Sequence, residues 1–93
     1  MGYVKVRNKK GTGRRVPPRG YRTWLEYWEK KKGQKAKGCM AYGCNGPADV
    51  GGHVIKSGRG GKEYILPICR VHNNMPEYEE YTVWEAHLVP VAH

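Results

Sequence analysis

The chain has 93 residues, of which 27% are charged and 13 are glycine, and it has no phenylalanine. A chain this short and polar cannot bury a large apolar core, so we expect an additional staple such as a metal ion. Lysine and arginine outnumber aspartate and glutamate by 17 to 8, and the formal net charge of +9 favours an anionic partner, nucleic acid first. No run of about 18 apolar residues exists and the first ten residues lack a signal-peptide core, so we expect a cytoplasmic protein without a membrane span.

The basic residues are concentrated in the first part of the chain. Residues 1–38 hold 13 basic and 2 acidic residues, a charge of +11, whereas residues 39–93 hold 4 basic and 6 acidic residues, a charge of −2. Residues 3–7 can form one short strand, and residues 8–20 are a tract rich in Gly, Pro, Lys and Arg. We expect residues 1–22 to be a basic, largely flexible arm that folds onto phosphates; a plain disordered terminus is the alternative.

A helix is predicted directly after this arm. Thr23 and Glu26 have the spacing of a capping box, in which their side chains accept hydrogen bonds from backbone amides at a helix start. The helix should cover residues 24–32, with Gly33 as its C-terminal stop. The two tryptophans of this helix and Leu25 share one side, which we expect to pack into the core. Stacking of this side on exposed nucleic-acid bases is the alternative.

All three cysteines and one histidine fall in one window with the spacing Cys-x4-Cys-x24-Cys-x2-His. Thiolates and a neutral imidazole suit Zn²⁺, and each short pair lies on one tight turn that can direct both ligands at a single ion. We therefore expect one structural zinc per chain. Unconnected buried thiols, or one disulfide with a free cysteine, are the alternatives, although an odd cysteine count argues against a disulfide framework. The expected ligands are Cys39, Cys44, Cys69 and His72.

The segment between the two ligand pairs predicts a β-hairpin. Residues 48–55 and 63–68 are β-prone, and residues 56–62 between them form a glycine-rich, basic turn. A zinc ion would then connect the loop before the first strand to the turn after the second. A further apolar run, residues 82–91, should add an edge strand, where Pro90 is tolerated.

These pieces together carry a resemblance to a known family. A knuckle is followed by a hairpin with Gly51-Gly52-His53-Val54 in its first strand, and then by the segment from Tyr64 to Asn74 with the second ligand pair. This order resembles the HNH endonuclease superfamily. It is most similar to small bacterial zinc proteins that combine a Trp-Leu-x-Tyr-Trp helix, a Gly-Gly-His-Val strand and a closing Leu-Val-Pro-Val segment. The resemblance covers residues 23–91 and implies an α+β fold: a zinc-stabilised treble-clef (HNH-like ββα) domain at residues 23–93, with an N-terminal helix and the flexible basic arm before it.

What the resemblance implies for catalysis differs from position to position. His53 takes the place of the first motif histidine, which in active HNH nucleases is the general base that activates water beside a divalent ion. Asn73 takes the last motif position and can ligate a metal through its carbonyl oxygen. Gly52 stands where an acidic metal ligand is common, and Tyr64 stands where an asparagine orients the histidine. One catalytic role is therefore kept, one is weakened and two are missing.

The residues around His53 give it little support as a base. Asp49 is the only carboxylate candidate on the same strand, and four residues of extended chain separate the two by about 13 Å. Three interpretations of His53 are open: a catalytic base, a structural histidine and a substitute zinc ligand. The paired glycines before it also have a structural explanation, because glycines in a strand mark a bulge or a close backbone approach.

Three functions follow. The leading one is a zinc-binding module that binds nucleic acid without catalysis, with no preference for a base sequence. The second is an HNH-type nuclease that uses His53, Asn73 and Mg²⁺ or Mn²⁺. The third is a zinc-stabilised protein-interaction or structural module whose charge serves only solubility. The cations expected at phosphates are Arg14, Arg15 and Arg19 in the arm and Lys56, Arg59 and Lys62 in the hairpin turn, although a solvated turn has the same composition.

Overall fold

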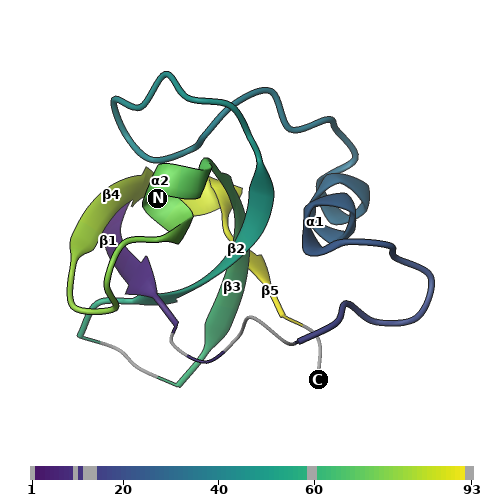
Figure 1. Ribbon diagram of the computed structural model, residues 1–93, viewed down its shortest axis with the longest axis horizontal. Helices are drawn as coiled ribbons and strands as arrows, with labels where there is room; N and C mark the ends of the chain where they lie inside the picture. The colour runs from purple at the N-terminus through teal and green to yellow at the C-terminus, as the bar shows by residue number, and fades with distance from the viewer. Residues whose placement is uncertain (1, 10, 12–14, 59–60, 92–93) are drawn as a thin grey trace.

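A computed structural model describes residues 2–9, 11, 15–58 and 61–91 of the chain (Figure 1). Its helices and strands, in chain order, are β1 (Tyr3–Asn8), α1 (Trp24–Lys32), β2 (Val50–Lys56), β3 (Glu63–Ile68), α2 (Arg70–Asn73), β4 (Glu80–Trp84) and β5 (Val89–Pro90). The five strands form one antiparallel sheet in the order β4-β1-β2-β3-β5. The α+β class expected from the sequence is confirmed.

Strand β1 lies inside the sheet, between β4 and β2. Its residue Val6 is in register with Tyr81 of β4 and with Lys56 of β2, and its side chain is fully buried. The sheet therefore includes residues that the sequence-based division places in the arm of residues 1–22. Pairing on both sides satisfies the backbone groups of β1, and its alternate apolar side chains join the core. The flexibility expected for the segment after β1 stays a prediction.

The predicted hairpin is present as β2 and β3, with Val50 in register with Ile68. The apolar run of residues 82–91 contributes to two edge strands rather than one. Strand β4 pairs with β1 at one edge of the sheet, and β5 pairs with β3 at the other. A short 3₁₀ turn, Glu85–His87, separates them. Pro90 lies in β5, where its missing N–H costs no ladder hydrogen bond.

Helix α1 begins and ends where the sequence predicts. Thr23 is extended, and its hydroxyl accepts a 3.0 Å hydrogen bond from the N–H of Glu26. The Glu26 carboxylate accepts from the backbone N–H of Arg22, one residue earlier than a regular capping box requires. Gly33 ends the helix in the left-handed region at φ 68°, which glycine adopts without a steric penalty. Within the described part of the chain, no helix has the length and apolar character needed to cross a bilayer.

The two tryptophans of α1 pack into the core that covers one face of the sheet, as predicted, whereas Leu25 is half-buried outside this cluster. Tyr27 and Trp28 are buried against Ile65 and Val89, and the Trp28 indole N–H donates to the backbone carbonyl of His87 at 2.7 Å. The helix backbone lies directly on β2, because a Cβ added at Gly51 would come within 2.6 Å of it. Figure 1 shows α1 beside β2, β3 and β5, at the far side of the sheet from β4.

The opposite face of the sheet carries a second core. Val6, Val54, Leu66 and Val83 are fully buried there and enclose the two cysteines Cys39 and Cys69. Strand residues alternate between the faces, so this core and the α1 core use different residues of the same strands. The sheet therefore separates a layer that contains the cysteines from a layer that contains α1.

Candidate metal centre

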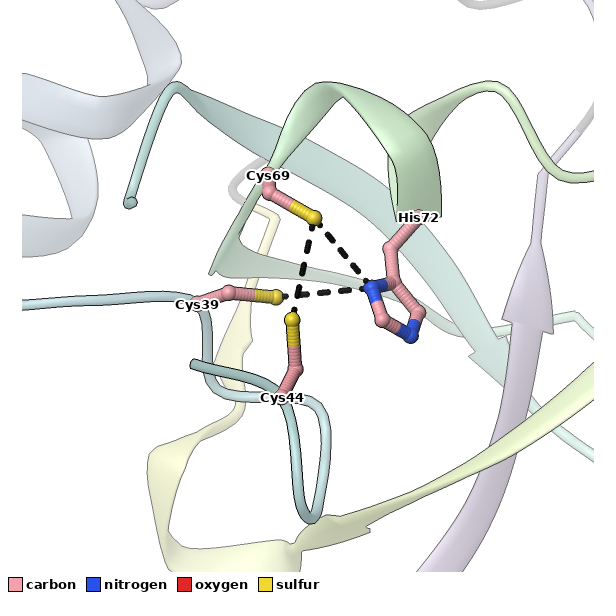
Figure 2. A group of neighbouring side chains, drawn as sticks. All are labelled: Cys39, Cys44, Cys69 and His72. Atoms are coloured by element: carbon pink, nitrogen blue, oxygen red, sulfur yellow. Dashed lines mark hydrogen bonds between the residues drawn. The ribbon is translucent and has the colours of Figure 1, made fainter. Parts of the chain in front are cut away.

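The four expected ligands lie together in the structure. Cys39 and Cys44 come from the loop before β2, and Cys69 and His72 come from the start and the body of α2 (Figure 2). Their ligand atoms all lie within 4.8 Å of one another. Figure 2 shows the three sulfur atoms and the His72 ring pointing toward one common point. The sequence spacing therefore predicted the members of this cluster.

The first ligand pair is held by a tight turn with internal backbone hydrogen bonds. The N–H of Cys44 donates to the carbonyl of Ala41 at 3.0 Å, and the N–H of Cys39 donates to the carbonyl of Gly46 at 2.9 Å. Gly43 has φ 78°, the left-handed conformation that such a turn needs. A side chain at Gly46 would come within 3.2 Å of the Cys69 Cβ, so glycine keeps the turn close to α2.

The second ligand pair is held by the first turn of α2. Cys69 is the N-terminal cap of this helix, and His72 lies three residues later, so both side chains project from one side of the turn. The N–H of Asn73 donates to the Cys69 carbonyl at 2.9 Å. The Asp49 carboxylate accepts a 3.0 Å hydrogen bond from the N–H of Arg70, which satisfies one free amide at this helix start. Asp49 thus positions α2 rather than His53.

The distances within the cluster fit a tetrahedral site for one ion. The Nδ1 of His72 lies 3.3 Å from the sulfur of Cys69 and 3.6 Å from that of Cys39, and the sulfurs of Cys44 and Cys69 are 3.9 Å apart. Zinc bonds of about 2.3 Å to sulfur and 2.0 Å to nitrogen place neighbouring donors about 3.5–3.8 Å apart. All four donors are protein side chains, so a tetrahedral ion here has no position left for water or substrate.

The local surroundings shift the pKa values of two of the thiols in opposite directions. The backbone N–H of His72 points at the sulfur of Cys69 and, as the largest cause, lowers the pKa of this thiol to about 6. Burial raises the pKa of Cys39 to about 11. Burial also raises the pKa of Tyr81, and the neighbouring Cys39 and Cys69 raise it further. The fold therefore favours the thiolate form of Cys69. Deprotonation of the buried Cys39 as well requires a cation, such as a metal ion, beside the sulfur atoms.

A polar contact outside the cluster fixes α2 to β1. The side-chain amide of Asn8 donates to the backbone carbonyl of His72 at 2.7 Å and to that of Met75 at 3.1 Å. Its amide oxygen accepts a 2.8 Å hydrogen bond from the hydroxyl of Tyr81, whose ring lies 5.1 Å from the His72 ring. No sequence pattern indicated Asn8 or Tyr81, because both reach the site through the order of strands in the sheet.

The geometry identifies the cluster as a site that can hold a metal ion. No family model, curated protein or solved structure matches this chain.

The two residues expected at a catalytic centre lie on opposite faces of β2. A side chain at Gly52 would come within 3.3 Å of the amide oxygen of Asn73. Gly52 and Asn73 therefore share the face of the sheet that carries the cysteine cluster, which we call the metal face. The neighbouring His53 points to the other face, where its ring contacts Trp24 of α1 edge-to-face at 4.6 Å. An acidic side chain at Gly52 would have to displace the Ile68 side chain, because a Cβ there would lie 2.3 Å from its end.

His53 belongs to a buried polar group beneath α1. Only 5% of this residue is exposed, and its Nε2 has no hydrogen-bond partner among the described residues. Burial lowers the pKa of His53, the nearby Glu63 opposes this shift, and Arg15 adds to it. Glu63 is itself buried and forms an ion pair with Arg15. The carboxylate near His53 therefore comes from the partner strand β3, and the register of the hairpin was the signal that could have identified it.

The expected phosphate-binding cations have different surroundings. Arg15 pairs with Glu63, and Lys56 pairs with Glu85 at 2.7 Å, so two of these charges are already compensated. Arg19 is exposed, and Lys62 is exposed beside the Tyr64 ring. Arg14 and Arg59 lie outside the described residues. Further exposed cations, which the sequence analysis did not single out, follow the middle of α1: Lys30, Lys31, Lys35 and Lys37.

Proposed function

We propose that the chain is a zinc-binding module that binds nucleic acid through its basic surface and does not cleave it. The observation that carries this proposal is the convergence of three thiols and one imidazole within 4.8 Å. Soft thiolate donors with one imidazole favour Zn²⁺ over Mg²⁺ or Ca²⁺, which prefer oxygen ligands. A site closed by four protein donors is typical of structural zinc, whereas catalytic zinc keeps one position open.

The order of the elements around the cluster supports a treble-clef architecture of the HNH-like kind. The first ligand pair lies in a turn before the hairpin β2–β3, and the second lies at the start of the helix α2 that follows the hairpin. The ion would therefore join the turn before the hairpin to the start of α2, two segments that also share the hydrogen bond from the N–H of Arg70 to the Asp49 carboxylate. Metal binding then contributes directly to folding, as in other small zinc domains.

The position of His53 favours a module without nuclease activity. A general base must come within hydrogen-bond reach of the water it activates. His53 is enclosed between β2 and α1, and it lies on the other face of the sheet from Asn73. The position of an acidic metal ligand is held by Gly52, which has no side chain to offer and lies against the Ile68 side chain. No second metal centre with oxygen ligands is formed by these residues.

The charge of the chain favours nucleic acid as the partner. The formal charge is +9, and one zinc with three thiolates would lower it only to +8, since +2 and −3 are added. Exposed cations at Arg19 and along residues 30–37 are distributed over the α1 side of the molecule. Such a surface neutralises phosphates without reading base edges, which predicts binding that depends steeply on salt and weakly on sequence.

One gel experiment tests both parts of the proposal. Zinc-loaded protein and His53→Ala are incubated with supercoiled plasmid, with and without Mg²⁺ or Mn²⁺, and cleavage and mobility are recorded together. We expect a salt-sensitive mobility shift without nicking, with a log–log slope of about 0.9 for each phosphate neutralised. Metal-dependent nicking that disappears in His53→Ala would establish a nuclease, and the absence of any shift at low salt would point to a protein partner.

A charge variant locates the binding surface. Changing Lys30, Lys31 and Lys35 together to Ala should weaken the shift strongly and reduce the salt slope, because each lost phosphate contact removes its counterion release. The matched control replaces Arg70, an exposed cation on α2, by Ala. If the triple variant binds as tightly as the control, the cations after the middle of α1 do not contact phosphates.

A further inference from the structure

The α1 face of the sheet is covered only in part. Helix α1 packs on β2, β3 and β5. The register of β1 with β2 and β4 places the side chains of Tyr3, Lys5 and Arg7 on this same face, next to Trp84 and Thr82. Figure 1 shows β1 and β4 at the end of the sheet away from α1. This half of the face therefore carries side chains that α1 does not bury.

Three aromatic rings gather there. Tyr3 lies at the centre, with its ring centroid 4.9 Å from that of Trp84 and 5.1 Å from that of Tyr42, both edge-to-face. Tyr3 is 59% exposed, Tyr42 70% and Trp84 36%. We call these three residues the aromatic surface. Single exposed apolar residues are common on protein surfaces, but a contiguous cluster of exposed rings indicates a binding surface.

Tyr42 connects the aromatic surface to the metal centre. It lies in the turn between the ligands Cys39 and Cys44, and its backbone N–H donates to the carbonyl of Thr82 at 2.8 Å. The neighbouring Ala41 forms a bridge with Val83 of β4. The turn that holds two ligands therefore also fixes the position of one ring relative to the other two.

The charges beside the aromatic surface are mainly positive. Lys5 and Arg7 follow Tyr3 on the same face of β1, and within the described residues no ion pair compensates either of them. Glu80 lies opposite Arg7 in register and is the acidic residue of this surface. Lys56 is in register with Val6, on the opposite face of the sheet, and forms an ion pair with Glu85. Exposed rings next to cations that form no ion pair among the described residues suit a ligand that has both flat apolar faces and negative charge.

We propose that the aromatic surface binds single-stranded nucleic acid, with bases stacked on Tyr3, Tyr42 and Trp84 and with Lys5 and Arg7 at the phosphates. This inference rests on the proposed nucleic-acid binding and adds the form of the ligand and a contact surface beyond the cations of α1. Aromatic side chains stack on unpaired bases of any sequence, and a cationic strand beside them follows the backbone. In a duplex the faces of the bases are covered by their neighbours, so the rings favour single strands over duplex.

The experiment measures binding of a fluorescein-labelled oligothymidylate of about 12 nucleotides, a length within the usual site size of such surfaces, to the full zinc-loaded chain. Fluorescence anisotropy gives the affinity, and an unlabelled duplex of the same length serves as competitor. We expect Tyr3→Ala, Tyr42→Ala and Trp84→Ala each to weaken binding about fivefold or more. The matched control is Tyr78→Ala, a tyrosine 76% exposed that lies outside the aromatic surface and should bind like the parent chain.

A conservative variant separates stacking from a structural role. Trp84→Phe keeps a ring for stacking, so its affinity should stay within about threefold of the parent. The quenching of tryptophan fluorescence on binding should nevertheless fall sharply in this variant, because the stacked indole is gone. Zinc content and far-UV circular dichroism confirm that each variant is folded.

The possible results distinguish this inference from the proposed function. If the oligonucleotide binds but the three ring variants match Tyr78→Ala, or if the duplex competes better than the single strand, the aromatic surface is not the site, while nucleic-acid binding stands. If neither single strand nor duplex binds at low salt, both proposals fall, and the same surface becomes a candidate for a protein partner.

Discussion

His72 and His53 lie on opposite faces of the sheet and have opposite surroundings. On the metal face, the Nδ1 of His72 lies 3.3 Å and 3.6 Å from two of the three thiols of a four-donor cluster. On the α1 face, His53 lies beside Trp24 and near Glu63, and its Nε2 is without a hydrogen-bond partner among the described residues. A buried histidine by itself therefore does not indicate a metal site, whereas the convergence of several donor atoms does.

The difference extends to how each face is stabilised. The metal face combines an apolar core around Val6, Val54 and Leu66 with a cluster of donors from the ligand turn and α2, and these donors repel each other as thiolates until a cation is bound. The α1 face is joined by apolar contact, with Tyr27 and Trp28 packed on Ile65. We therefore expect the metal face to respond to loss of the ion and the α1 face to respond to changes of shape.

The largest expected effect is loss of the metal face when the ion or a ligand is removed. Zinc binding in domains of this kind is linked to folding by about 10 kcal/mol or more. Chelation, Cys69→Ser or His72→Ala should therefore abolish the cooperative unfolding transition, measured by far-UV circular dichroism with zinc content determined in parallel. His87→Ala, which changes a histidine outside the cluster, should keep one zinc per chain. An unchanged transition after complete removal of zinc would contradict a structural role.

Two neighbouring glycines allow the two faces to be tested separately. A Cβ at Gly51 would lie 2.6 Å from backbone atoms of α1, which cannot move without displacing the helix. A Cβ at Gly52 would lie 2.3 Å from the end of the Ile68 side chain, which can rotate. We expect Gly51→Ala to lower the free energy of unfolding by about 3 kcal/mol and Gly52→Ala by about 1–2 kcal/mol.

Denaturant titration of the two variants decides this order. Gly2→Ala is the control, because nothing lies within 4 Å of a Cβ there. If Gly52→Ala is the more damaging change, the metal face is the more rigid of the two and the expectation above is reversed.

A smaller effect is expected at the contact between β1 and α2. Asn8→Ala removes the side-chain donor to the half-buried carbonyls of His72 and Met75, although the His72 carbonyl keeps the N–H of Met75, and should cost about 1–3 kcal/mol of unfolding free energy. Tyr81→Phe removes one hydrogen bond to Asn8 and should cost about 1 kcal/mol. Thermal unfolding of zinc-loaded protein measures both. Asn45→Ala, an exposed change in the ligand turn, is the control and should leave stability within about 0.5 kcal/mol of the parent.

Sequence patterns predicted the parts of this molecule that depend on near neighbours in the chain. The Thr23 cap and the Gly33 stop define α1, the hairpin follows from two β-prone runs around a glycine-rich turn, and the ligand set follows from short spacings. In each case the deciding contact is local or is imposed by the chemistry of one ion. Such contacts can be predicted from the sequence because the residue types involved have few other structural roles.

The parts that depend on strand order were not predictable in the same way. Tyr3–Asn8 is short and precedes a Gly/Pro-rich basic tract, so nothing local places it between β2 and β4. Asn8 reaches α2, and Tyr3 reaches Trp84, only through that placement. The position of Glu63 near His53 required the hairpin register, which a seven-residue turn leaves open. The pairing of strands that are distant in sequence thus determines the surroundings of the site, whereas short sequence motifs determine its ligands.

The smallest expected effect is a pH dependence of stability that belongs to the α1 face. Burial holds the pKa of His53 below its ordinary value of 6.5, and Arg15 adds to this, while Glu63 partly opposes it. The unfolded chain therefore binds more protons near that pH than the folded chain, so stability should fall as the pH drops below 6.5. His53→Gln has no such group, and its stability should fall less steeply over the same range. Both proteins keep the same four ligands, so release of zinc in acid contributes equally to each and cancels in the comparison. Urea titrations at pH values above and below 6.5 measure the stability of both proteins. If the two proteins lose stability in parallel, His53 is protonated as easily in the folded protein as in the unfolded chain, and the α1 face is open to water.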